Sequence, residues 1–138
     1  MANDALVSAV KAVVALAKAG KSDEAYAAYA ALFSSAPFGT YATADQRQAL
    51  KLMILAKGIP TFPSPSIAAA HTAAMAPLRA LIAAESEPAD HEMLGLCQAR
   101  TGDNDGALIT FKAGLDIERA RDAQSDLCGR LMKWVASV

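Results

Sequence analysis

The chain has 138 residues and a formal net charge of −1. This length suits one domain, and the near-neutral charge lacks the basic excess of nucleic-acid-binding proteins, so we expect no nucleic-acid partner. Hydrophobic residues make up 54% of the sequence, but about a quarter of the chain is Ala, the best helix former. No segment alternates apolar and polar residues as a strand does, so we predict an all-α fold.

Helix start and stop signals predict seven helices. The first has Asn3 or Asp4 as its N-cap, and Pro37 prevents the second from continuing. The third begins with a capping box, in which Gln46 follows Thr43 at the required spacing. The predicted helices cover approximately residues 4–19, 22–34, 43–57, 66–85, 89–101, 104–120 and 123–136.

Two proline features interrupt this pattern. Residues 58–66, with the sequence GIPTFPSPS, predict a stiff loop, because proline restricts the backbone and offers no backbone N–H donor. Pro77 lies inside the fourth predicted helix. That segment therefore either kinks at Pro77 or contains the start of a second short helix.

Two segments share a spacing typical of helical hairpins. In each, a Gly precedes an Ala by five residues and an aromatic residue follows that Ala by four. The Gly opens the turn, the small Ala lets two helices approach, and the aromatic side chain fills the space between them. The two segments contain Gly20, Ala25 and Tyr29, and Gly102, Ala107 and Phe111.

Both segments resemble the tetratricopeptide repeat. The second carries the Leu-Gly pair of that family at Leu94 and Gly95, and the first carries the terminal proline at Pro37. The first copy departs from the pattern, because Ala12-Val13 replaces its Leu-Gly pair. The two copies lie more than two periods of about 34 residues apart, so a divergent helix pair is expected between them.

The resemblance implies antiparallel helical hairpins stacked as a short solenoid of about seven helices. All of them belong to a single domain over residues 1–138. Its parts would be a first hairpin (1–40), a divergent helix pair (41–87) with the proline-rich loop 58–66, a second hairpin (88–120) and a capping helix (121–138). The alternative left open is a compact helical bundle without an open groove.

In this family, the first helix of each hairpin lines a concave partner-binding face. The resemblance places seven residues there: Val7, Val10, Val14 and Lys18 from the first copy, and Glu92, Leu96 and Arg100 from the second. Lys18 and Arg100 occupy equivalent places, which predicts an apolar groove with a basic rim. The Asn residues with which family members clasp a carboxylate are missing. The alternative is that Lys18 and Arg100 are exposed helix ends that balance the helix dipole.

We therefore predict a protein–protein interaction module, an adaptor that holds a peptide or helix of a partner protein. Two alternatives remain. One is a self-associating structural subunit, a homodimer joined by the apolar stripe of the last helix, and the other is a helical bundle that holds a small apolar ligand. The stripe consists of Leu127, Leu131, Trp134 and Val135.

No catalytic or metal-binding motif is complete, so we predict neither an enzyme nor a bound cofactor or metal. His91-Glu92 lacks the second His of a zinc-protease helix, and Lys112 stands where a calcium loop would need Glu. Cys97 and Cys128 are expected to be reduced and buried, with a disulfide between neighbouring helices left open.

The N-terminal segment has no positive charge ahead of its apolar stretch, and Lys11 and Lys18 interrupt that stretch. These features argue against a signal peptide and against a membrane span there. We therefore expect a cytoplasmic protein without membrane insertion.

Overall fold

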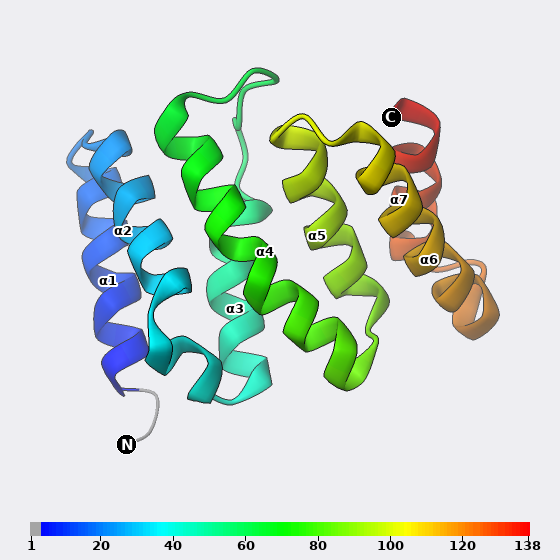
Figure 1. Ribbon diagram of the computed structural model, residues 1–138, viewed down its shortest axis with the longest axis horizontal. Helices are drawn as coiled ribbons and strands as arrows, with labels where there is room; N and C mark the ends of the chain where they lie inside the picture. The colour runs from blue at the N-terminus through cyan, green and yellow to red at the C-terminus, as the bar shows by residue number, and fades with distance from the viewer. Residues whose placement is uncertain (1–3) are drawn as a thin grey trace.

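The computed structural model describes residues 4–138, and within that range the chain is all-helical, with no strand. Its elements are α1 (Asp4–Lys18), α2 (Ser22–Ser34), the short 3₁₀ helix η1 (Ala36–Thr40), α3 (Thr43–Ile54), α4 (Pro65–Glu85), α5 (Pro88–Arg100), α6 (Asn104–Asp122) and α7 (Asp126–Ser137). Figure 1 shows the helices side by side along the long axis, with α1 and α7 at opposite ends. The predicted all-α class is confirmed.

The pair α1–α2 turns at Gly20, whose φ of 78° lies in the left-handed region that favours glycine. The predicted N-cap Asn3 lies outside the described residues. The side chains expected at the helix crossings of both hairpins are all buried, namely Ala25, Tyr29, Ala107 and Phe111.

A row of aromatic rings joins the end of α2 to η1. Phe33 stacks on Tyr29 with the ring centroids 5.6 Å apart, and its edge meets Phe38 of η1 at 5.3 Å. Phe38 is almost completely buried and also contacts Tyr41. These rings lie at the end of the α1–α2 pair where α2 leads into η1.

The start of α3 differs from the prediction, because Thr43 does not cap the helix. The N-cap is Ala42, which makes no side-chain hydrogen bond to the helix. Gln46, the expected partner of Thr43, instead donates its amide hydrogens to the carbonyl oxygens of Tyr41 and Gly39 ahead of the helix. The side chain of Gln46 therefore fixes the chain entering α3 without closing a capping box.

The central helix α4 is continuous from Pro65 to Glu85, so no second helix begins at Pro77. Figure 1 shows α4 changing direction near its middle, as a proline inside a helix makes it do. α4 packs against α2 on one side and against α5 on the other. By length and composition α4 is the one described helix that could cross a membrane, which is weak evidence because core helices of soluble proteins share these properties.

The pair α5–α6 is the most tightly packed hairpin. A Cβ atom at Gly95 would overlap the ring of Phe111, so only glycine lets α6 approach this closely. The pair turns at Gly102, with φ of 95°, and Asp103 then caps α6 by accepting a hydrogen bond from the Gly106 amide at 2.9 Å. α6 therefore begins at Asn104, where a helix start was predicted.

The last helix, α7, packs against α6. Leu131 is completely buried, and Trp134 stacks on Phe111 with the ring centroids 6.1 Å apart. Leu127 and Val135 are half-buried and pack against the same core. The chain's own core therefore already covers much of the stripe that was predicted as a joint between two copies.

Candidate functional site

An open groove runs between α1 and α3. Because α1 packs against α2, its other side is left open, and Val7 keeps 43% of its surface exposed there. Leu52 of α3 is equally exposed, at 43%, and contributes to two adjacent cavities of about 170 and 390 Å³. We call this surface the α1–α3 groove. Its α1 and α3 walls include Val7, Val10, Val14, Lys18, Gln48 and Leu52, and α2 also lines the larger cavity through Ser22, Ala25, Tyr26 and Tyr29.

The charges beside the groove are few and mainly basic. Lys11 and Asp45 line the smaller cavity, and Lys18 lines the larger one. Lys11 and Lys18 are seven residues apart on α1, which puts them on the same side of the helix, two turns from each other. The groove is therefore an apolar channel with two lysines on its α1 rim.

All four site residues predicted from the first repeat copy, Val7, Val10, Val14 and Lys18, lie along this groove. Sequence reasoning missed the opposite wall, which α3 supplies through Asp45, Gln48 and Leu52. A signal was present, since these residues recur at helical spacing on one face of the third predicted helix. Without a clear repeat pattern in residues 41–87, nothing assigned that face to a groove.

Glu92, predicted on the partner-binding face, is buried against α7 instead. Its carboxylate accepts hydrogen bonds from Arg130 Nε at 2.9 Å and from Trp134 Nε1 at 3.0 Å. Glu92 therefore holds the last helix in place, and a partner could reach its carboxylate only after α7 had moved.

Arg100 is not an exposed helix end, so that alternative is wrong for Arg100. Its Nη1 donates to the carbonyl oxygen of Ile54, which ends α3, at 2.7 Å and to His71 Nε2 of α4 at 3.0 Å. His71 Nδ1 donates in turn to the Ile67 carbonyl oxygen at 2.7 Å. Burial is the main cause that lowers the pKa of His71, and the positive charge of Arg100 lowers it further.

Leu96 and Arg100 line a second cavity, of about 370 Å³. Trp134 of α7, which stacks on Phe111 of α6, forms part of its wall, and the loop before α4 contributes Ile59, Pro60 and Thr61. We call it the α5–α7 cavity. Apart from the buried Glu92, the residues predicted from the two repeat copies are therefore divided between two separate hollows, with Lys18 in the α1–α3 groove and Arg100 in the α5–α7 cavity.

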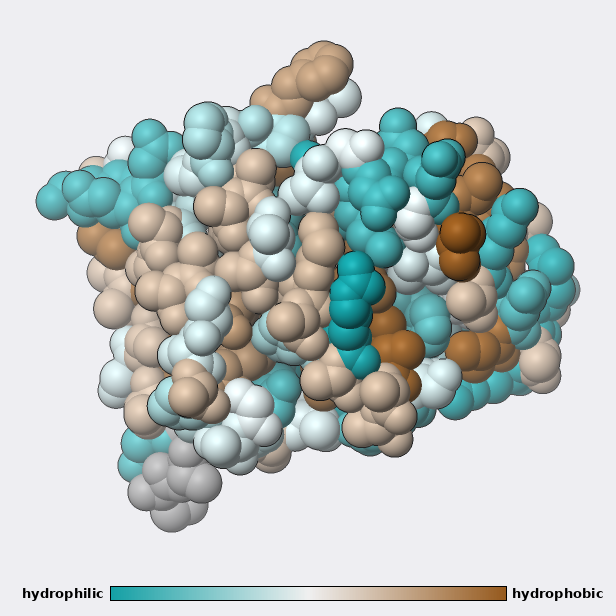
Figure 2. Space-filling view, in the orientation of Figure 1, coloured by the Kyte–Doolittle hydropathy of each residue, from teal (hydrophilic) through white to brown (hydrophobic). Residues whose placement is uncertain are grey.

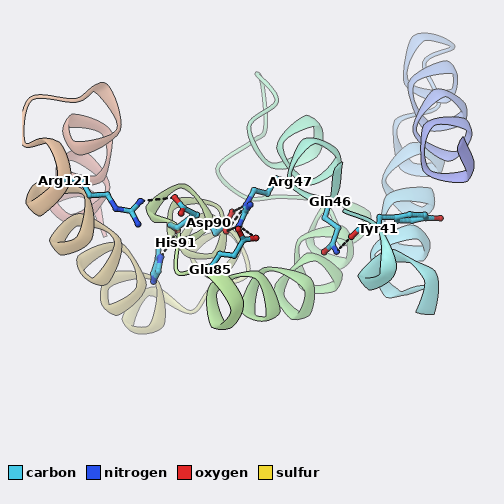
Figure 3. A network of polar contacts seen from close by, with 8 residues as sticks. Tyr41, Gln46, Arg47, Glu85, Asp90, His91 and Arg121 are labelled. Carbon is cyan, nitrogen blue, oxygen red and sulfur yellow. Dashed lines mark hydrogen bonds and ion pairs between the residues drawn. The ribbon is translucent and has the colours of Figure 1, made fainter. Parts of the chain in front are cut away.

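Apart from the groove and the cavity, a cluster of polar side chains lies at one end of the helices (Figure 3). Arg47 of α3 donates from Nε, at 3.0 and 3.1 Å, and from Nη2, at 2.8 Å, to the carboxylate of the completely buried Asp90 of α5, and Nη2 also donates to Glu85. Arg121 of α6 pairs with Glu87 at 3.0 Å. Since each charge in this network has a partner inside the protein, the network joins helices and offers no free group to a ligand.

The two cysteines are free thiols, and both are buried. Burial raises the pKa of Cys97 to about 12, so its thiol carries no charge at neutral pH. The two cysteines therefore form no disulfide with each other, and each packs as a small apolar side chain. Within residues 4–138, no group of His, Cys, Asp or Glu is arranged to hold a metal ion.

Neither the α1–α3 groove nor the α5–α7 cavity can be made out as a brown cleft on the face of the molecule that Figure 2 shows. Figure 2 shows mostly tan side chains over α2 and α4, as the alanine content predicts, and a mixture of hydrophilic and hydrophobic side chains over α6. No protein-family model, curated protein or solved structure matches the chain. The α1–α3 groove and the α5–α7 cavity are therefore the features of the molecule that bear on its function.

Proposed function

We propose that this protein is a binding module that holds an amphipathic helix of a partner protein in the α1–α3 groove. The observation that carries the proposal is an apolar channel left open to solvent, with Val7 and Leu52 each 43% exposed on opposite walls. Exposed apolar side chains gathered in a groove are typical of interaction sites, and an apolar groove between helices suits a helix.

The spacing on α1 favours an acidic partner. Val7 and Val14 are seven residues apart, and so are Lys11 and Lys18. A helix lying along α1 would match this register with apolar residues every three or four positions and carboxylates about seven residues apart. The two lysines would then pair with those carboxylates at the rim and set the orientation of the partner.

We also propose that the helix pairs form a short solenoid similar to tetratricopeptide repeats, with α7 as the capping helix. Two features support this architecture. The α1–α2 and α5–α6 pairs both turn at a glycine with positive φ and bury an Ala and an aromatic ring at the same spacing. α7 packs its apolar face on the last pair, as a capping helix does.

A binding role is proposed rather than a catalytic one because the buried ionisable side chains are engaged in structural contacts. His71 bonds Ile67 and Arg100, Asp90 bonds Arg47, and the carboxylate of Glu92 binds α7. None of these side chains lines the α1–α3 groove.

The test uses a synthetic amphipathic helix with Leu in the apolar register and Glu at heptad spacing, titrated calorimetrically. Saturable binding is expected, and Lys11→Glu with Lys18→Glu should weaken it by about tenfold or more, since two pairings become repulsions. The matched control is Lys112→Glu with Lys133→Glu, two exposed lysines on α6 and α7 that should leave binding unchanged. Arg100 is avoided, because reversing its charge would break its contacts with α3 and α4.

Equal losses in the two double variants would contradict the proposed site. Light scattering on the protein alone tests the other occupant, a second copy of the chain. A dimer that Val7→Asp separates into monomers would assign the groove to self-association and overturn the adaptor proposal.

A further inference from the structure

The α5–α7 cavity lies apart from the α1–α3 groove and has the size of a small-molecule site. Its volume of about 370 Å³ falls in the range of ligand pockets. Two large apolar side chains contribute to its wall, Leu96 of α5 and Trp134 of α7, and Trp134 stacks on the completely buried Phe111 of α6. Its polar side chains are those of Thr61, Arg100, Asn104 and Ser137, and Val138 also lines it. The cavity thus combines an apolar wall with few polar groups, as ligand sites do.

Arg100 differs from the other arginines that the fold buries or engages. Arg47, Arg121 and Arg130 each pair with a carboxylate. Arg100 is partly buried, yet it forms no ion pair within residues 4–138. Cys97 is near Arg100, but burial raises the pKa of its thiol, so Cys97 carries no charge at neutral pH. A cation held inside a protein without a counter-ion is costly, which leaves Arg100 ready to accept an anion.

The guanidinium of Arg100 is also held in place. Both of its hydrogen bonds involve Nη1, which donates to the Ile54 carbonyl oxygen and to His71. Nε and Nη2 make no hydrogen bond with any described residue and are not sealed from solvent. These two groups form the edge of a guanidinium that binds a carboxylate through two parallel hydrogen bonds.

We propose that the α5–α7 cavity binds a small organic carboxylate, with the acid group on the Nε–Nη2 edge of Arg100 and the apolar body against Trp134. The side chain of Trp134 is fixed in orientation, because its Nε1 donates to Glu92 at 3.0 Å and its ring stacks on Phe111. Pro60 stiffens the loop on the other side of the cavity. The fixed cation selects the acid, and the aromatic wall favours a body of ring or short-chain size.

Trp134 provides a direct readout because it is the single tryptophan of the chain. Phenylacetate should change its fluorescence saturably and shift the indole N–H signal in a ¹⁵N spectrum. Phenylacetamide, which has the same body and no charge, should bind at least about tenfold more weakly. Phenylphosphonate tests the other anion, and tighter binding of phenylphosphonate than of phenylacetate would overturn the assignment to a carboxylate.

Substitutions at Asn104 and Arg100 test whether the charge in the cavity, rather than the shape of the cavity, controls binding. Asn104 begins α6, so the carboxylate added by Asn104→Asp is compatible with the positive end of the helix dipole. Inside the cavity, the same carboxylate would compete with a bound acid for Arg100. It should weaken phenylacetate binding by about tenfold, whereas Asn104→Ala should have little effect. Arg100→Gln should abolish binding; if that variant does not fold, Asn104→Asp still decides. Equal binding of acid and amide, or equal loss in the two Asn104 variants, would overturn the proposal.

Discussion

At the scale of single residues, His71 is notable because it is completely buried and both of its ring nitrogens are engaged. Nδ1 donates to the Ile67 carbonyl oxygen, so Nε2 carries no hydrogen and accepts from Arg100. A proton added at Nε2 would remove that acceptor and place a second positive charge beside the guanidinium. Burial and Arg100 therefore both lower the pKa of His71.

This lowered pKa makes stability depend on pH in a definite direction. Below about pH 6.5, His71 binds a proton in the unfolded chain, whereas the lowered pKa keeps it neutral in the folded chain. The free energy of unfolding therefore falls as the pH drops. The limiting slope is about 1.4 kcal/mol per pH unit. Urea unfolding at about pH 7.5 and about pH 5.5 measures it. His71→Gln keeps an acceptor for Arg100 without titrating, and an unchanged pH dependence in that variant would contradict the prediction.

Two glycines in helices should respond oppositely to substitution by alanine. A Cβ at Gly95 would overlap the Phe111 ring, so Gly95→Ala should cost about 1–3 kcal/mol through overpacking. A Cβ at Gly129 of α7 meets nothing within 4 Å, so Gly129→Ala should stabilise by about 0.5–1 kcal/mol through helix propensity. Thermal unfolding of both variants tests this pair, and a stable Gly95→Ala protein would mean that α6 can move away from α5.

At the scale of elements, the ion pair between Arg47 and Asp90 joins α3 to α5 across a boundary with few other contacts. Arg47→Met should cost about 3–5 kcal/mol, because it leaves the carboxylate of Asp90 buried without a partner. Arg121→Met is the control, since Arg121 and Glu87 are 50% and 41% exposed and their pair should contribute about 1 kcal/mol or less. Equal effects of the two substitutions in urea unfolding would show that the buried pair does not stabilise the α3–α5 contact.

The extents of the helices were largely predictable because local signals set them. Gly20 and Gly102 mark turns whose backbone geometry favours glycine, and both helices that follow them begin where expected. The contacts of Arg100 and Glu92 were not predictable in this way. Arg100 reaches a carbonyl 46 residues earlier in the chain, and Glu92 reaches a base 38 residues later. Such pairings depend on how helices pack, which spacing along one helix cannot report.

At the scale of the whole molecule, α5 is the best-buried helix and α1 is one of the least buried. Every residue of α5 from His91 to Gln98 is buried, and α4, α6 and α3 pack around it. Along α1 only Leu6 and Val13 are buried, because its contacts are with α2 and its α3 side is open. Local stability should therefore decrease from the centre of the row toward α1.

Native-state hydrogen exchange measures this gradient amide by amide. The slowest exchange is expected in α5, and the amides of α1 should exchange many times faster, because α1 can open without exposing the rest of the core. An occupant of the α1–α3 groove would add apolar contacts to α1 and slow its exchange, while α5 would change little, because its amides already report global unfolding. Protection gained by α7 instead, with α1 unchanged, would place the main interaction surface of this protein at its C-terminal end.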